Sequence, residues 1–134
     1  MSTRAIYTFK GFGETYHVYK HHDGYLSGAA VALENAIQLA WGAPRYEPDE
    51  FAAAFVSGNK QSPGGVRLAK SQTAFGDVEY AYVVEPDKKI PNVLKVTAYS
   101  AEFWDGKPKK KKIWSGPLST FIVTASQIED KYYA

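Results

Sequence analysis

The amino-acid sequence predicts an α+β fold, in which a mostly antiparallel sheet with an N-terminal hairpin packs against a two-helix hairpin. Residues 4–20 form two alternating runs of strand-favouring residues, joined at Gly11-Phe12-Gly13. Residues 26–59 instead contain two stretches in which apolar residues recur at helical spacing. Short strand patterns occupy most of the remaining chain. Strands grouped around a pair of helices are typical of this fold class.

The first strand pattern, residues 4–10, places Ala5, Tyr7 and Phe9 on one side of the strand. The residues between them fall on the other side, because successive side chains of a strand point to opposite faces. Residues 14–20 alternate in the same way after the glycine-rich turn. We therefore expect an antiparallel hairpin with a loop of about three to four residues.

A first helix is predicted over residues 26–41, where apolar residues follow the i, i+4, i+7 spacing of one helix face and alanines fill the gaps. Gly42 and Pro44 end it. The predicted buried face consists of Leu26, Ala30, Leu33, Ile37 and Trp41.

A second helix is predicted to begin at Pro48-Asp49-Glu50, because proline is preset for a first helical turn and the two acids complement the helix dipole. Phe51, Ala54 and Phe55 provide its buried face, and Gly58-Asn59 ends it. The two helices would form a hairpin with a short link.

Further strands are predicted beyond a flexible turn at residues 60–65. The strand predicted over residues 66–69 is short, and the strands predicted over residues 77–85 and 93–100 are longer. Asp105-Gly106 is a typical hairpin turn.

The C-terminal part is expected to complete the sheet. Residues 107–112 hold five lysines and one proline, and Ile113-Trp114 and residues 118–124 continue the strand patterns. The predicted order is ββααβββββ. With no internal repeat and no linker, we expect a single domain over residues 1–134.

Composition narrows the class of protein. With 16 basic and 14 acidic residues the formal net charge is +2, which is too small to indicate a nucleic-acid partner. Cysteine is absent, which excludes disulfides, thiolate catalysis and cysteine-ligated zinc. No apolar run approaches the ~18 residues of a membrane span. We expect a cytoplasmic protein without a membrane partner.

Lys20, His21, Asp23 and Tyr25 form the first candidate ligand-binding cluster, with His22 beside them. They lie where a strand ends and a helix begins. The first backbone N–H groups of a helix have no intrahelical partner. Alternation would separate Lys20 and His22 from His21 and Asp23, so the four side chains need not converge. Alternatively, His21 is a hydrogen-bonded structural histidine and its neighbours are solvated.

The histidines His17, His21 and His22, together with Asp23, match no known spacing of metal ligands, so no metal or other cofactor is predicted. Two histidines near a lysine would suit general acid–base cleavage of a phosphodiester. Paired catalytic histidines usually come from separate segments, and we assign no catalytic residue. A His-dependent phosphodiesterase or nuclease stays as an alternative.

Asn59, Lys60 and Arg67 form the second candidate, since a helix end followed by Gly64-Gly65 and an arginine can shape an anion-binding nest. The spacing is not that of a nucleotide-hydrolase loop, and the alternative is a mobile turn.

Tyr80 and Tyr82 share one face of a predicted strand with Val78 and Val84, and they could stack a nucleotide base or belong to the core. The lysines of residues 107–112 could contact the phosphate backbone of a nucleic acid, or they could form a solvated hairpin arm.

Several segments between residues 4 and 80 resemble a family of small phage and prophage proteins. These segments are Arg4-Ala5-Ile6-Tyr7-Thr8-Phe9, Val18-Tyr19-Lys20-His21 with Asp23-Gly24-Tyr25, Asp49-Glu50-Phe51-Ala52-Ala53-Ala54-Phe55-Val56 with Asn59-Lys60, and Gly76-Asp77-Val78-Glu79-Tyr80. Leu26 departs from the family pattern, which has proline after Asp-Gly-Tyr. The chain also resembles viral anti-defence sponges that sequester cyclic ADP-ribose signals of the Thoeris system, which are small α+β proteins assembled from dimers. This second resemblance implies a function class and no site.

We therefore predict a phage-derived, non-enzymatic protein that sequesters a phosphorylated cyclic nucleotide immune signal in the cytoplasm of the infected bacterial host, and so blocks anti-phage defence. A homodimer or a multiple of dimers is expected, because strands are expected at exposed sheet edges. The main alternative is a protein-binding inhibitor of a host enzyme, which would expose an apolar patch and hold no small molecule.

Overall fold

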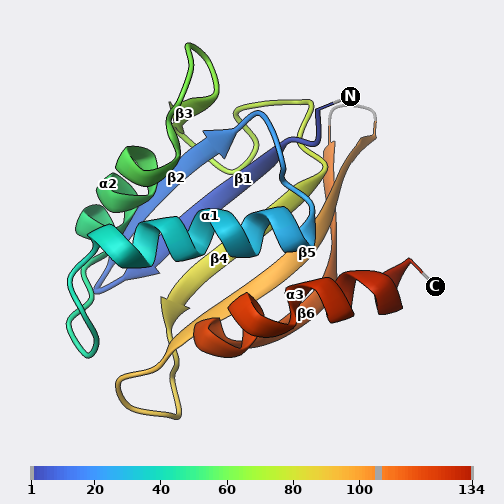
Figure 1. Ribbon diagram of the computed structural model, residues 1–134. Coiled ribbons are helices and arrows are strands. Elements are labelled where there is room, and N and C mark those ends of the chain that lie inside the picture. Colours follow the sequence, from blue (N-terminus) through green and yellow to red (C-terminus); the bar gives the residue numbers. More distant parts are fainter. Residues whose placement is uncertain (1, 105–106, 134) are drawn as a thin grey trace.

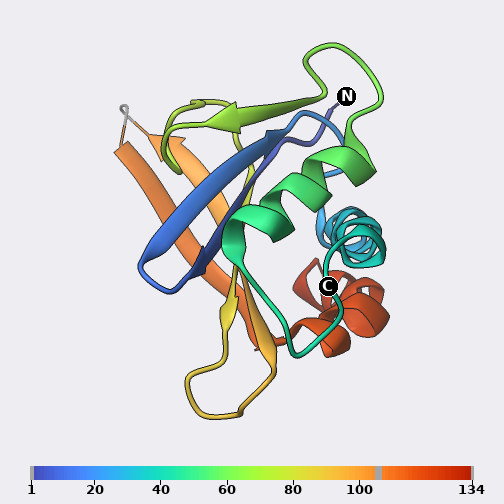
Figure 2. The same ribbon diagram turned by 90° about the vertical axis from the view of Figure 1, so that its left-hand side faces the viewer.

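The computed structural model describes residues 2–104 and 107–133, and within them it shows one six-stranded sheet with three helices on one of its faces (Figures 1 and 2). The strand order is β3-β2-β1-β4-β5-β6, and every neighbouring pair is antiparallel except β1 and β4. The predicted α+β class is confirmed. The strands are β1 (Ala5–Gly11), β2 (Glu14–Lys20), β3 (Val66–Ala69), β4 (Tyr80–Pro86), β5 (Leu94–Trp104) and β6 (Lys107–Pro117). The helices are α1 (Leu26–Leu39), α2 (Pro48–Asn59) and α3 (Leu118–Tyr132).

The N-terminal hairpin forms as predicted, with a tighter turn. Gly11 pairs with Glu14, so only Phe12 and Gly13 connect the strands. Both have positive φ, 54° and 79°, which is the backbone of a two-residue mirror-image turn. The expected loop of three to four residues is therefore wrong. Such a turn matches the twist of the flanking strands, which lets the pairing continue to its end.

The helices cover the sheet face that carries Tyr7, Phe9 and Tyr82, all fully buried. Helix α1 lies between α2 and α3 and contacts both (Figure 2). It enters this layer at Gly24, where a Cβ atom would lie 2.7 Å from the Cβ of Ala5. A side chain at residue 24 would collide with β1, so glycine allows the chain to cross close to the sheet.

Helix α1 ends at Leu39, earlier than predicted. Leu26, Ala30 and Leu33 of the predicted face are buried, which confirms the first part of that face. The buried set is Leu26, Ala29, Ala30, Ala32, Leu33 and Ala36. Ile37 and Trp41, which were expected in the core, are 39% and 44% exposed.

The strand predicted over residues 118–124 is wrong, because this segment begins helix α3. Leu118, Phe121 and Ala125 are buried at the i, i+3, i+7 positions of one helix face. The observed order is ββααββββα. The β-branched residues Ile122, Val123 and Thr124 favour a strand locally, and packing of the apolar stripe on α1 and the sheet overrides that preference.

Helix α2 and strand β3 have the predicted bounds, whereas β4 begins only at Tyr80. The preceding loop, residues 70–79, crosses the sheet face opposite the helices. There Phe75 and Val78 pack against Ile6 and Tyr19. Val78 therefore lies on the other side of the sheet from Tyr80 and Tyr82, contrary to the predicted shared face.

Strand β5 extends beyond the predicted residue 100, and β6 runs continuously from Lys107 to Pro117. The predicted Asp105-Gly106 turn lies outside the described residues. The side chains of residues 102–110 do too, so the role of the lysine run stays a prediction. Within residues 2–104 and 107–133, no helix has both the length and the apolarity needed to cross a membrane.

Candidate functional site

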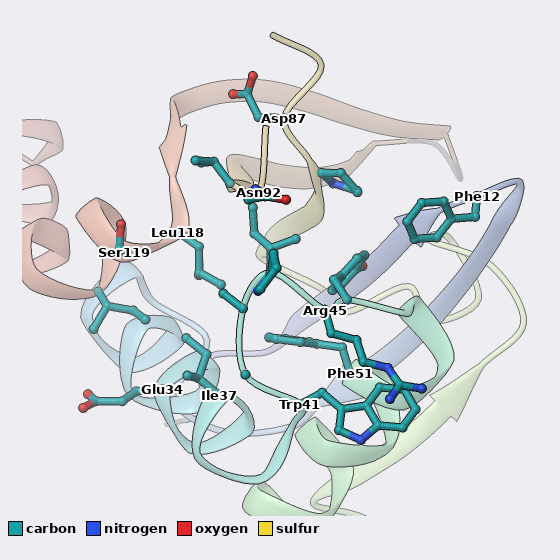
Figure 3. A pocket seen from close by; sticks show the side chains of 18 residues that line it. Phe12, Glu34, Ile37, Trp41, Arg45, Phe51, Asp87, Asn92, Leu118 and Ser119 are labelled. Carbon is teal, nitrogen blue, oxygen red and sulfur yellow. The ribbon is translucent and has the colours of Figure 1, made fainter. Parts of the chain in front are cut away.

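A pocket of about 640 Å³ lies at the end of the sheet where β1 turns into β2. Four parts of the chain meet there: the hairpin turn, the link between α1 and α2, the β4–β5 connection and the first turn of α3. Figure 3 shows their side chains around the cavity. Its apolar and aromatic walls include Phe12, Ile37, Trp41, Tyr46, Phe51 and Leu118.

A stacked pair, Trp41 and Arg45, lies on one side of the pocket (Figure 3). The Cζ atom of Arg45 is 3.3 Å from the centroid of the Trp41 ring, which is cation–π geometry. Stacking uses the flat face of a guanidinium and leaves its N–H edge available. That edge has one described ion-pair partner, Glu47, at 3.3 Å from Nη2. Arg45 can therefore still bind an anion.

The α1–α2 link is fixed by two contacts that give the pocket its shape. Glu50, in the first turn of α2, accepts a hydrogen bond from the backbone N–H of Trp41 at 3.2 Å. The Tyr46 hydroxyl donates to the carbonyl of Lys10 at 3.0 Å, and its ring packs on Phe51. Burial, and secondly the charge of Glu85, raise the pKa of Tyr46, so its phenol stays protonated and keeps donating. The aromatic wall is thus held in place before any ligand arrives.

Polar groups are few in the pocket, and two of them are acidic. Glu34, Asp87, Asn92 and Ser119 line it together with Arg45. Asp87 accepts hydrogen bonds from the backbone N–H groups of Lys89 and Ile90, and these bonds lower its pKa. The lining therefore carries one cation and two carboxylates. A ligand with several negative charges would have to keep them beside Arg45 and away from the two acids.

The residues predicted from sequence lie elsewhere, at the opposite end of β1 and β2. Lys20 donates through Nζ to the carbonyl of His22 at 2.6 Å, and partial burial lowers its pKa. Tyr25 donates to Asp23 Oδ1 at 3.3 Å. These contacts form two pairs, Lys20 with His22 and Tyr25 with Asp23, so these polar groups already have partners within the protein.

His21 lies on the other side of the strand from Lys20, as alternation predicted. Its separation from His22 was predicted wrongly, because the two imidazole rings are 4.7 Å apart, measured between centroids. The Nδ1 atom of His21 is 2.8 Å from the Tyr19 hydroxyl and 3.4 Å from Arg4 Nε. Arg4 also pairs with Asp77 at 2.9 Å. The structure therefore brings His21 together with residues that sequence reasoning did not select.

The second predicted cluster is divided by the structure. Lys60 donates to the carbonyl of Val66 at 3.3 Å, near the end of β2. Arg67 lies over the ring of Phe75, with Cζ 4.7 Å from its centroid, on the sheet face opposite the helices. The two cations therefore make separate contacts.

Tyr80 and Tyr82 are core residues, which is the alternative that the sequence left open. Their exposed fractions are 8% and 0%, and the Tyr82 hydroxyl donates to the buried carbonyl of Gly24 at 2.6 Å. Tyr82 also stacks on Tyr7. Neither ring can stack a nucleotide base without leaving the core.

Asn59 is also buried, and its amide connects α2 to α1. Nδ2 donates to the carbonyls of Ala32 and Phe55 at 3.0 and 2.8 Å, and Oδ1 accepts from Asn35. Both N–H donors of the amide and one acceptor position of Oδ1 therefore serve the helix pair. The structure therefore assigns Asn59 a structural role.

Replacing Asn59 by alanine is expected to lower the free energy of unfolding by about 1–3 kcal/mol, because it removes the buried hydrogen bonds that the amide makes to the carbonyls of Ala32 and Phe55. Asn35→Ala is the graded control, since it removes only the half-buried donor to Oδ1. Urea denaturation of both variants measures the difference. An equal loss in the two variants would contradict the assigned role.

Sequence reasoning missed Trp41 and Arg45. The segment Trp41-Gly42-Ala43-Pro44-Arg45-Tyr46 combines rings, a cation and a proline in a helix link, where exposed aromatic residues are a signal for binding. That signal was overlooked because Trp41 also fits the helical spacing of a core face. Among the described residues, no group of three or more histidine or acidic side chains is placed to hold a metal ion.

Comparison with protein-family models, with curated proteins and with solved structures found no match. The resemblances to phage proteins and to anti-defence sponges therefore stay predictions. Any function has to be argued from the geometry of the chain itself.

Proposed function

We propose that the protein binds a small molecule that carries a flat ring and a phosphate group, and holds it unchanged in the aromatic pocket. The observation that carries this proposal is the Arg45 guanidinium stacked 3.3 Å from the Trp41 ring in a pocket of about 640 Å³. This volume lies within the range of about 300–1,000 Å³ that small-molecule sites occupy. The pocket thus joins an aromatic surface for a ring to a donor edge for an anion.

Charge sets the orientation of the ligand. A phosphate beside Glu34 or Asp87 would be repelled, whereas beside Arg45 it would gain charge-assisted hydrogen bonds. The ring would then lie against the apolar wall near Ile37 and Leu118. A cyclic nucleotide signal has this division into a flat base and a phosphate, so sequestration of such a signal, and with it a block of host anti-phage defence, is the function that we infer.

The proposal predicts that nucleotide binding depends on Arg45 and not on Arg67. Both guanidinium groups lie over an aromatic ring, but Arg67 faces Phe75, outside the pocket, and is a matched control. A panel of cyclic and linear nucleotides should contain a member that raises the melting temperature through mass action. Arg45→Ala should weaken that ligand about ten-fold or more, because a charge-assisted bond contributes roughly 1.5–3 kcal/mol.

Quenching of tryptophan fluorescence gives the affinities, and chromatography should return the nucleotide intact. Equal losses in Arg45→Ala and Arg67→Ala would refute the pocket as the site. Product formation that His21→Ala abolishes would instead favour the phosphodiesterase.

A second candidate, binding to a protein partner, is favoured by the exposed apolar residues around the pocket mouth. Phe12 is 74% exposed, Trp41 44% and Ile37 39%, and all three line the pocket. Such a concentration of apolar side chains is typical of an interaction surface. If no nucleotide changes the melting temperature, this rival becomes the better explanation, with Phe12 and Trp41 as its expected contacts.

A further inference from the structure

A network of polar side chains, here called the corner cluster, lies at the start of β1, far from the aromatic pocket. Its members are Arg4, Tyr19, His21, His22 and Asp77. The pocket lies beyond the other end of β1, where Tyr46 bonds Lys10. Seven residues of strand span roughly 20 Å, so the two regions cannot share one small ligand.

We propose that the corner cluster is a second binding site, which takes a phosphate group through Arg4 and His21. The site is independent of the proposed pocket. The proposal rests on which donors of the cluster are already used and which are not.

The contacts of His21 determine which ring nitrogen carries its proton. Nδ1 faces the Tyr19 hydroxyl at 2.8 Å and Arg4 Nε at 3.4 Å. Arginine can only donate, so Nδ1 is the acceptor in the contact with Arg4. The single proton of the Tyr19 phenol then points to Nδ1 at 2.8 Å, and not to the Asp77 carboxylate at 3.3 Å. Nδ1 is therefore the acceptor, and the proton of the neutral ring lies on Nε2. His21 thus offers an N–H group on the side away from Tyr19.

Arg4 has unused donors as well. Its contacts to Asp77 and to His21 both use Nε, and its guanidinium also hydrogen-bonds the Tyr19 phenol. A guanidinium has four further N–H groups on its two terminal nitrogens, so donors remain for an anion. The Arg4 side chain is 31% exposed, so an ion can reach it from solvent. A guanidinium fork beside an imidazole N–H suits the tetrahedral oxygens of a phosphate.

The surroundings hold both side chains in place. Asp77 orients Arg4, while the Tyr19 ring stacks on Phe75 at 4.2 Å. His22 lies edge-on to His21 at 4.7 Å, and Ser2 bonds its Nδ1 at 2.8 Å. The donors are therefore fixed before the anion binds, which lowers the entropy cost of binding.

The test follows the imidazole signals of His21 by NMR while inorganic phosphate, and separately adenosine monophosphate, is added. Without ligand, the nitrogen spectrum should show His21 protonated at Nε2. Both ligands should then shift its signals along a saturating curve. Similar affinities would show that the phosphate group alone is recognised, and a much tighter monophosphate would assign the site to a nucleotide.

Arg4→Lys keeps a cation near Asp77 but loses the fork, so it should remain folded and bind phosphate about ten-fold or more weakly. Arg45→Ala should leave this titration unchanged, which separates the site from the aromatic pocket. Shifts of His21 that do not saturate with either ligand, or unchanged affinity in Arg4→Lys, would overturn the proposal.

Discussion

Replacing Phe55 by alanine is expected to lower the free energy of unfolding by about 3–5 kcal/mol, the largest effect of any substitution considered for this protein. Phe55 is fully buried at the centre of the contact between α2 and the sheet. Its ring lies 4.5 Å from that of Tyr7 and 5.4 Å from that of Phe9, measured between centroids. Truncation would leave a cavity between α2 and the sheet. The rigid sheet cannot move to fill this cavity.

Phe12→Ala is the matched control, because the same side chain is deleted where it is 74% exposed. Its effect should stay within about 0.5 kcal/mol. Urea denaturation followed by circular dichroism compares the two variants at unchanged m-value. If Phe12→Ala lowered the free energy of unfolding as much as Phe55→Ala does, the hairpin turn would have to be covered in solution. This result is expected if the protein partner is a second copy of the chain.

The elements that the sequence predicted correctly are those whose signals are local. The N-terminal hairpin follows from strict alternation, and α2 follows from Pro48-Asp49-Glu50 together with its apolar face. Helix α3 was missed because its first seven residues, which end at Thr124, include several strand formers. The decisive helical spacing appears only when Leu118 and Phe121 are read together with Ala125, beyond the segment considered.

The candidate sites could not be predicted in the same way, because both are assembled from distant segments. Tyr19 and Asp77 are 58 residues apart in the chain, and the loop that brings them together has no regular pattern. The aromatic pocket combines four connections whose geometry depends on where each helix ends. Trp41 illustrates the difficulty, since ending α1 at Leu39 moved this residue from the predicted core to the pocket wall.

The buried tyrosines show that residue type alone does not predict the role of a side chain. From the sequence, Tyr80 and Tyr82 could either stack a nucleotide base or belong to the core. In the structure the Tyr82 hydroxyl donates to the carbonyl of Gly24 and so fixes the entry into α1. Tyr7, stacked on Tyr82 at 5.1 Å, has the only fully buried side-chain polar atom without a hydrogen-bond partner among the described residues. The same chemical group therefore has opposite energetic consequences at neighbouring positions.

Tyr82→Phe is expected to lower the free energy of unfolding by about 1–3 kcal/mol, because the buried Gly24 carbonyl loses its donor at 2.6 Å. Tyr7→Phe is expected to raise it by roughly 1 kcal/mol, since the desolvation cost of an unpaired hydroxyl is removed while the ring stays in place. Burial raises the pKa of both phenols, so both are neutral and the comparison does not depend on their ionisation.

The two variants thus form a pair with the same substitution, the same sheet face and opposite expected signs. Each phenylalanine preserves the aromatic packing, which leaves the hydroxyl as the difference that denaturation measures. If Tyr7→Phe proves as destabilising as Tyr82→Phe, the Tyr7 hydroxyl must bond to a buried water in solution, close to Asp23, whose charge contributes to the raised pKa of Tyr7. If Tyr7→Phe instead raised the free energy of unfolding, the unpaired Tyr7 hydroxyl would be shown to destabilise the folded protein.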